Sequence, residues 1–121
     1  MLGKPSAGGV VTVYHQTSPE IANDILKQGF KAGHGGWCGG AVYFAASPQD
    51  TVSKAIAASS HHGAMLEARV AMGRTCHLDR HCVGWQKLRA MGCDSIEFNP
   101  GDGMEFVVYD PRRVLSVREV P

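Results

Sequence analysis

Short apolar runs, separated by glycines and Ser-Pro pairs, divide this chain and set its fold class. Runs of this length that are rich in β-branched residues are typical of buried strands, and they are too short to cross a membrane as helices. Residues 64–71 alternate apolar and polar side chains, which predicts a strand with one exposed face. We expect strands at residues 10–15, 41–45, 64–71, 93–98, 104–110 and 114–120.

Two Ser-Pro pairs predict where helices begin. Ser18-Pro19 and Ser47-Pro48 each supply an N-cap hydroxyl and a proline at the first helical position. We expect the first helix to end at Gly29 and a third, short helix to cover residues 84–91 and end at Gly92. The apolar residues expected on the buried faces of the first two helices are Ile21, Ile25 and Leu26, and Val52, Ala55 and Ile56.

The order of these elements predicts an α+β fold, because helices lie mainly early in the chain and strands dominate its second half. With 121 residues, of which 44% are hydrophobic, the chain can build the core of one domain. We therefore expect a single domain over residues 1–121. Residues 1–9 are expected to form a loose lead-in to it.

The charge balance gives little attraction to polyanions. A formal net charge of +1 creates no long-range field that would favour nucleic acid or an anionic membrane. The N-terminal region has no apolar core of signal-peptide length, so we expect an intracellular protein, cytoplasmic or nuclear. In that compartment the four cysteines, Cys38, Cys76, Cys82 and Cys93, are expected to be reduced thiols.

The segment at residues 33–40 contains five of the 15 glycines, together with Trp37 and Cys38. It leaves a helix and enters a strand, which is the reverse of the dinucleotide fingerprint, and no Lys-Ser/Thr pair follows it as in a P-loop. Two interpretations stay open. The segment is either an ordinary surface loop or a glycine wall that lets a ligand approach the backbone.

The cysteines and histidines of residues 76–82 do not have the spacing of a zinc site. Cys76 and Cys82 are too far apart for a zinc knuckle, and no second matched pair follows. We therefore expect a polar loop here and no bound metal. A Cys-His nucleophile would best be supplied by Cys38, although nothing marks this thiol as activated. No Gly-x-Ser-x-Gly elbow supports a serine triad.

Three polar residues stand out within or beside the apolar runs: His15, Tyr43 and Glu105. Each alone has an ordinary structural explanation, as a satisfied strand-end histidine, a core tyrosine with its hydroxyl at the rim, or a solvated glutamate. Their neighbours make the set more informative, because each residue belongs to a longer motif.

Three segments resemble the ADP-ribosyltransferase superfamily, in particular a minimal catalytic domain of the poly(ADP-ribose) polymerase type. They are Val13-Tyr14-His15-Gln16-Thr17-Ser18, Gly39-Gly40-Ala41-Val42-Tyr43-Phe44-Ala45 and Glu105-Phe106-Val107-Val108-Tyr109-Asp110. They occur in the family's order and span residues 13–110. The resemblance implies split antiparallel sheets with a few short helices, a His-Tyr-Glu triad, and NAD+ as substrate without a metal.

The resemblance also implies the chemistry: cleavage of the nicotinamide–ribose bond and transfer of ADP-ribose to a macromolecular acceptor. The segment before Glu105 is short, which argues for transfer in single units. Glu105 would bind the ribose 2-hydroxyl and stabilise an oxocarbenium-like transition state. Tyr43 would stack on nicotinamide, and His15 would bind a hydroxyl of the adenosine ribose. The residues implied to contact NAD+ are His15, Gln16, Thr17, Trp37, Gly39, Tyr43 and Thr51.

The chain departs from the family pattern at three points. Gln16 replaces the usual glycine whose backbone grips the nicotinamide carboxamide. Thr51 is the best match for the hydroxyl residue that also binds this group, with Ser47 as the other choice. A second stacking aromatic is missing from the following helix, and Trp37 is the candidate to replace it or to cover the site.

Other functions stay open beside transfer. The same fold could hydrolyse NAD+ with water as acceptor, or could bind NAD+ or ADP-ribose with little turnover. A structural zinc module is the remaining alternative. We expect a monomer whose acceptor is a protein in preference to a nucleic acid, and no membrane partner.

Overall fold

The computed structural model describes residues 5–31, 40–54, 63–78, 83–99 and 103–120. These residues form one mixed sheet of eight strands, in the order β1-β5-β6-β7-β3-β2-β4-β8, and three short helices. The domain therefore has the predicted α+β fold. The strands are β1 (Pro5–Ala7), β2 (Val10–Thr17), β3 (Val42–Ala45), β4 (Ala64–Ala71), β5 (Arg74–His77), β6 (Ser95–Phe98), β7 (Glu105–Val108) and β8 (Val114–Val120), and the helices are α1 (Pro19–Gln28), α2 (Pro48–Lys54) and α3 (Trp85–Ala90).

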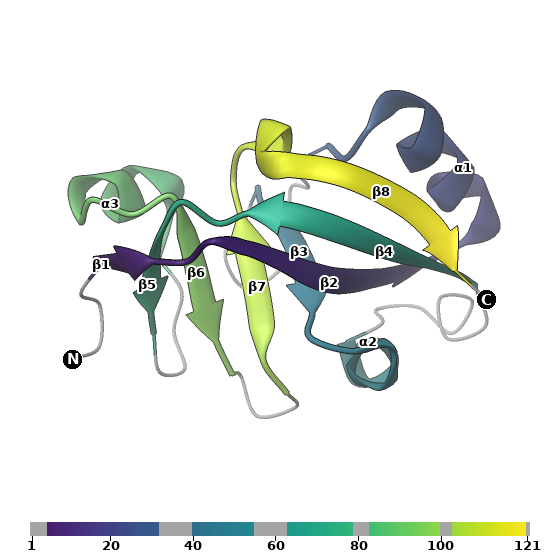
Figure 1. The fold of residues 1–121 in the computed structure, drawn as a ribbon, viewed down its shortest axis with the longest axis horizontal. Coiled ribbons are helices and arrows are strands. Elements are labelled where there is room, and N and C mark those ends of the chain that lie inside the picture. The colour runs from purple at the N-terminus through teal and green to yellow at the C-terminus, as the bar shows by residue number, and fades with distance from the viewer. Residues whose placement is uncertain (1–4, 32–39, 55–62, 79–82, 100–102, 121) are drawn as a thin grey trace.

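The sheet is almost divided where β2 meets β3. In Figure 1, β2, β4 and β8 run across the view, whereas β3, β5, β6 and β7 run down it. β2 pairs with β4 from Val10 to Thr17, but it shares only one paired position with β3, Tyr14 opposite Ala45. The strands separate beyond this position, so the sheet has two halves that lie at a steep angle to each other.

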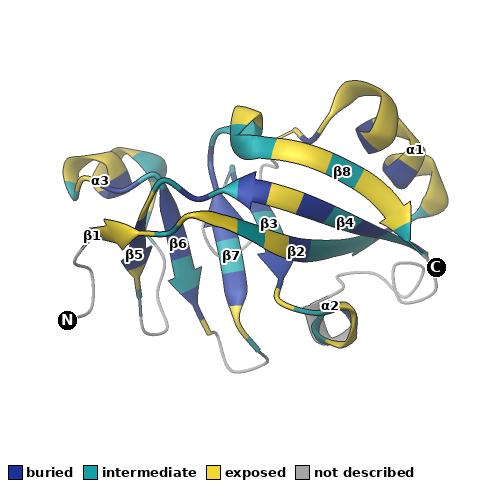
Figure 2. Cartoon of the chain, viewed as in Figure 1, coloured by how far each residue is buried: buried dark blue, intermediate teal, exposed yellow. Residues whose placement is uncertain are grey.

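Two core clusters pack against this sheet. Figure 2 shows buried positions alternating with more exposed ones along β4. The α1-side core consists of Val13, Ala22, Ile25, Phe30, Val42, Phe44, Ala64, Leu66, Ala68, Val70, Met72 and Val108. The α3-side core consists of Ala41, Cys76, Leu88, Cys93, Ile96, Phe98, Val107 and Tyr109. Successive side chains of a strand point to opposite faces. β3 therefore contributes Phe44 to the first cluster, while Tyr43 packs against the second.

The helix starts follow the sequence signals, but the buried face of α1 differs from the prediction. Ser18 caps α1 by accepting a hydrogen bond from the Ile21 amide, and Gly29 ends it with a φ of 84°. Ile25 is buried as expected, whereas Ile21 and Leu26 are 53% and 40% exposed. Ala22 takes the inner position, because its small side chain lets the helix approach the sheet closely. The side chains of Val52, Ala55 and Ile56 lie outside the described part of the chain.

Two strands were not predicted. β1 lies in the expected loose lead-in and pairs antiparallel with β5, and β5 occupies the start of the expected polar loop. β5 in turn pairs in parallel with β6, which buries Thr75 and Cys76. Short segments with mixed polarity carry no local strand signal, and they become ordered through their partners.

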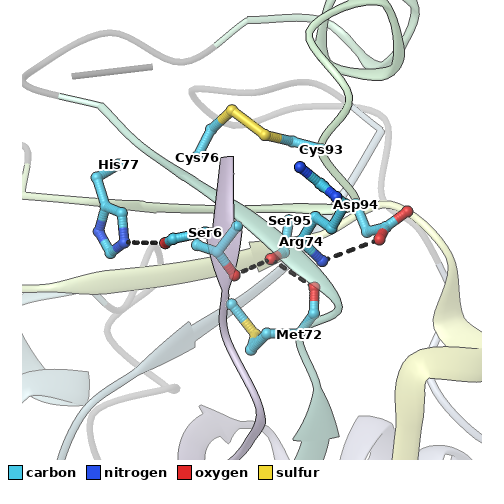
Figure 3. The surroundings of a disulfide bond; sticks show 9 residues. Ser6, Met72, Arg74, Cys76, His77, Cys93, Asp94 and Ser95 are labelled. Atoms are coloured by element: carbon cyan, nitrogen blue, oxygen red, sulfur yellow. Dashed lines mark hydrogen bonds between the residues drawn. A yellow bond between two sulfur atoms is a disulfide. The ribbon is translucent and has the colours of Figure 1, made fainter. Parts of the chain in front are cut away.

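A disulfide joins Cys76 of β5 to Cys93, which precedes β6 (Figure 3). The prediction of reduced thiols is therefore wrong for these two residues, and Cys76 has no thiolate to offer a zinc ion. The pairing arises because the parallel β5–β6 ladder returns the chain to within a Cα–Cα distance of 5.9 Å after 17 residues. Cys38 and Cys82 lie outside the described residues. No helix within the described ranges is long and apolar enough to cross a membrane.

Candidate functional site

The candidate site lies where β2 and β3 separate. Past the Tyr14–Ala45 pair, the His15 side chain bridges the two strands, with Nδ1 at 3.0 Å from the Tyr43 carbonyl oxygen. Since a carbonyl only accepts hydrogen bonds, this contact assigns the proton to Nδ1 and leaves a lone pair on Nε2. The histidine thus donates a hydrogen bond to a main-chain carbonyl at the point where pairing between β2 and β3 ends.

His15 is held in its neutral form by its surroundings. Burial lowers the pKa of His15, and the hydrogen bond with Tyr43 opposes this shift only in part. Its ring meets Phe30 and Phe44 edge-on, at centroid distances of 5.3 and 6.1 Å. Both phenylalanines belong to the α1-side core. The imidazole is therefore an oriented, uncharged donor and acceptor on that side of the sheet.

Tyr43 and Glu105 lie close together on the opposite face. In the β3–β7 ladder Tyr43 is opposite Val107 and Ala45 is opposite Glu105, so the two side chains are diagonal neighbours on one face. Glu105 is only 7% exposed, in contrast to the solvated strand end that a lone glutamate predicts. Tyr43 packs against the α3-side core and lies near enough to Tyr109 to help burial raise the pKa of Tyr109 to about 12.

Gln16 and Thr51 meet across the gap on the same face as Tyr43. Gln16 follows His15 on β2, so its side chain points away from the α1-side core. Thr51 is 4% exposed, and its hydroxyl lies 3.2 Å from Gln16 Oε1 and 2.6 Å from the Pro48 carbonyl. Ser47 is used differently: its hydroxyl accepts a hydrogen bond from the Asp50 amide and so caps α2.

The other residues that were predicted to contact NAD+ lie either on the opposite face of the sheet or outside the described residues. Thr17 is buried two positions after His15 and points to the same side of β2 as that histidine. Trp37 and Gly39 lie outside the described residues, as does Cys38. The structure therefore brings Tyr43, Glu105, Gln16 and Thr51 to one face, whereas His15 and Thr17 lie on the other and are joined to the set through the Tyr43 carbonyl.

The connection between β6 and β7 packs against α2 beside this set. A Cβ atom on Gly103, which has a φ of 113°, would lie 3.2 Å from Asp50 Cγ. The Gly103 amide also donates a hydrogen bond to Asn99 Oδ1. Glycine is favoured here because the backbone is left-handed and the approach to α2 is close. The contact holds the first turn of α2 next to the strand that carries Glu105.

A pocket of about 340 Å³ opens beside His15 on the α1 side. Its walls come from α1, the segment that follows it and the start of β3. Ile25 and Phe30 form apolar wall, and Tyr43 borders it. Asp24, Gln28 and Lys31 supply polar and charged groups to the same walls. Such a mixture of apolar wall and a few polar groups is typical of small-molecule sites.

A larger cleft of about 680 Å³ lies at the other end of the sheet, around Trp85 and Tyr109. Trp85 stacks on Tyr109 at 5.2 Å, and Arg89 lies over the indole. Arg113 and Arg112, which also line it, form ion pairs with Asp94 and Asp110. These groups are engaged with one another, so we place the candidate site at the β2–β3 gap, where the polar groups converge.

One polar row was missed entirely by sequence reasoning. Ser6 Oγ lies 3.2 Å from His77 Nε2, and His77 Nδ1 lies 3.0 Å from Glu97 Oε2 (Figure 3 shows the first contact). The order resembles a serine triad, but the residues come from three neighbouring strands and line neither pocket described above.

Within the described ranges, no three His, Cys, Asp or Glu side chains lie close enough to hold a metal ion.

Comparisons with known proteins add little to this geometry. No protein-family model matches the chain, and no curated protein sequence matches it. Among solved structures, it is similar to a chain in the crystal structure of the M. tuberculosis MbcT–MbcA toxin–antitoxin complex. The identity is 15% and the TM-score 0.46, over 96% of this chain and 87% of that chain. At these values the likeness carries no argument about family or function.

Proposed function

We propose that this protein is an NAD-dependent ADP-ribosyltransferase with its active site at the β2–β3 gap. The observation that carries the proposal is that a buried Glu105 and Tyr43 are diagonal neighbours on one face of β3 and β7, the face to which Gln16 and Thr51 also belong. A carboxylate, a flat aromatic ring and a hydroxyl are the groups that an ADP-ribose donor site requires, and all three are on this face.

In the proposed reaction, the bond between the nicotinamide nitrogen and C1 of its ribose breaks, and nicotinamide leaves as a neutral molecule. An acceptor nucleophile forms a new bond to the same carbon and loses its proton. The transition state is oxocarbenium-like, as in glycoside hydrolysis. Glu105 would accept a hydrogen bond from the ribose 2-hydroxyl and stabilise the positive charge that develops on the sugar.

The two faces suggest how the donor would lie. Nicotinamide would stack on Tyr43, with its carboxamide near Thr51 and the backbone of Gln16. The adenosine half would occupy the pocket beside His15, where Nε2 has a lone pair for a ribose hydroxyl. A dinucleotide bound in this way would cross from one face of the sheet to the other where β2 and β3 separate.

The test is a comparison of Glu105→Gln with Glu97→Gln, using NAD+ labelled in the adenosine half. Glu97 is a matched control, since it lies on the adjoining strand but is paired with His77. We expect Glu105→Gln to lose about 10²–10³-fold in the rate of NAD+ cleavage while NAD+ binding changes little. Glu97→Gln should cleave like the parent.

Equal rates for Glu105→Gln and the parent would remove Glu105 from the mechanism. The labelled products settle the acceptor class in the same experiment. Label attached to protein supports transfer, whereas free ADP-ribose without labelled macromolecule would identify a glycohydrolase. Measurable NAD+ binding without cleavage by the parent would identify a binding module.

A further inference from the structure

The contact between Gln16 and Thr51 places a primary amide beside the hydroxyl that we expect to bind one. Gln16 Oε1 lies 3.2 Å from Thr51 Oγ1, and the Gln16 side chain is on the same face of the sheet as Tyr14 and Tyr43. The side-chain amide of glutamine has the same C=O and NH₂ groups as the carboxamide of nicotinamide. Gln16 therefore offers Thr51 the contact that a bound nicotinamide would offer.

Thr51 does not need Gln16 to satisfy its hydroxyl. A hydroxyl has one proton, and the 2.6 Å contact with the Pro48 carbonyl is the shorter of its two oxygen contacts. With the proton given to Pro48, the Thr51 oxygen can accept a hydrogen bond from an amide N–H. A half-turn of the Gln16 amide supplies that N–H without moving the side chain. The hydroxyl is thus set up to receive an amide donor.

The Gln16 side chain is not locked into the core. It is only partly buried, so water can replace its contact with Thr51 once the amide swings outward. Its neighbour across β4 is Met65, whose sulfur also lies 3.9 Å from the Thr51 hydroxyl. A thioether is flexible and adapts readily to a changed neighbour. The surroundings therefore permit an exchange between the glutamine amide and another amide.

We propose that the Gln16 side chain is a built-in competitor for the carboxamide of NAD+. It occupies the Thr51 hydroxyl in the free protein and is displaced when the dinucleotide binds, which lowers the affinity for NAD+. This inference rests on the function proposed above. It assigns to Gln16 control of substrate affinity through the nicotinamide end alone, with no effect on the adenosine end.

The experiment compares the parent with Gln16→Ala and Gln16→Val. Valine favours strands and is too short to reach Thr51, so it provides a second variant if alanine disturbs folding. Gln86→Ala is the matched control, because Gln86 is an exposed glutamine on α3. Two ligands are titrated: an NAD+ analogue with a carbocyclic nicotinamide ribose, which cannot be cleaved, and ADP-ribose, which has no carboxamide.

We expect both Gln16 variants to bind the NAD+ analogue about tenfold more tightly than the parent, the value of one exchanged hydrogen bond. Their affinity for ADP-ribose, and both affinities of Gln86→Ala, should stay at the parent values. Unchanged or weaker analogue binding by the Gln16 variants would overturn this inference while leaving the proposed function intact. Equal shifts for both ligands would also overturn it, since they indicate a general structural effect. If neither parent nor variants bind the analogue, the proposed function fails as well.

Discussion

Removal of the Cys76–Cys93 disulfide should lower the stability of the oxidised protein by about 3 kcal/mol. The bridge closes a loop with a sequence separation of 17, which contains α3 and leads into β6. For a loop of this length the loss of chain entropy in the unfolded state is worth about 3 kcal/mol. Small domains have a total stability of about 5–15 kcal/mol, so the bridge would supply a large share of it.

The variant that isolates this effect is Cys76→Ala with Cys93→Ala. Both cysteines are buried, at 0% and 3% exposure, and alanine keeps these positions apolar. The free energy of unfolding is measured by urea titration for the oxidised parent, the reduced parent and the double variant. We expect the reduced parent and the double variant to be less stable than the oxidised parent by similar amounts.

The control is the double variant measured with reductant, because any change in its free energy of unfolding reports the contribution of Cys38 and Cys82. An oxidised parent no more stable than the double variant would refute the loop-entropy argument. Failure of reductant to destabilise the parent, beyond its effect on the variant, would do the same. Peptide mapping under non-reducing conditions shows directly whether the two half-cystines are linked.

Two further predictions concern the candidate site. Tyr43→Ala should weaken binding of the non-cleavable NAD+ analogue by about tenfold, since aromatic stacking is worth about 0.5–1.5 kcal/mol beyond burial; an unchanged titration would exclude Tyr43 from the nicotinamide site. Burial lowers the pKa of His15 in the folded state, so the unfolded chain takes up this proton first as the pH falls below about 6.5. Stability should therefore decrease from that pH down to the folded pKa, and urea titrations at pH 7.5 and 5.5 should show a smaller decrease for His15→Gln; equal decreases would contradict this.

Local signals were enough to predict most of the fold. The two Ser-Pro pairs begin helices as expected, and the alternating residues of β4 give a strand with one buried face. β1 and β5 were missed because their order comes from pairing with each other and with β6. The disulfide was missed for the same reason. A separation of 17 residues carries no local signal, and the compartment argument gave the wrong oxidation state.

The site could be predicted only as a set of residue types. Strand assignment and motif order pointed to His15, Tyr43 and Glu105, but alternation along β2 and β3 decides which face each side chain takes. The structure turns Tyr43 and Glu105 to one face and the His15 ring to the other. The Gln16–Thr51 contact depends on where α2 docks, which no sequence pattern reveals. The roles of Trp37 and Gly39 stay predictions.

The opening between β2 and β3 explains why His15 has a structural task whatever its part in catalysis. Full pairing of the two strands would satisfy their backbone groups but would close the separation that begins after the Tyr14–Ala45 pair. At this point the Tyr43 carbonyl accepts a hydrogen bond from His15 Nδ1, and losing a hydrogen bond to a part-buried carbonyl would be costly. The imidazole therefore supports the separated arrangement of the two strands.

This has a consequence for how substitutions of His15 are interpreted. Loss of the imidazole would remove its hydrogen bond to the Tyr43 carbonyl and would also remove the ring packed against Phe30 and Phe44. A decrease in NAD+ cleavage by His15→Ala could therefore have two causes, a changed separation of β2 and β3 or the loss of a contact with NAD+. His15→Asn can separate them, since its side-chain amide can still donate to a carbonyl but presents no imidazole Nε2. If that variant keeps the parent's stability and loses NAD+ affinity, His15 contacts the substrate. If it loses both together, the effect on binding follows from the structure of the gap.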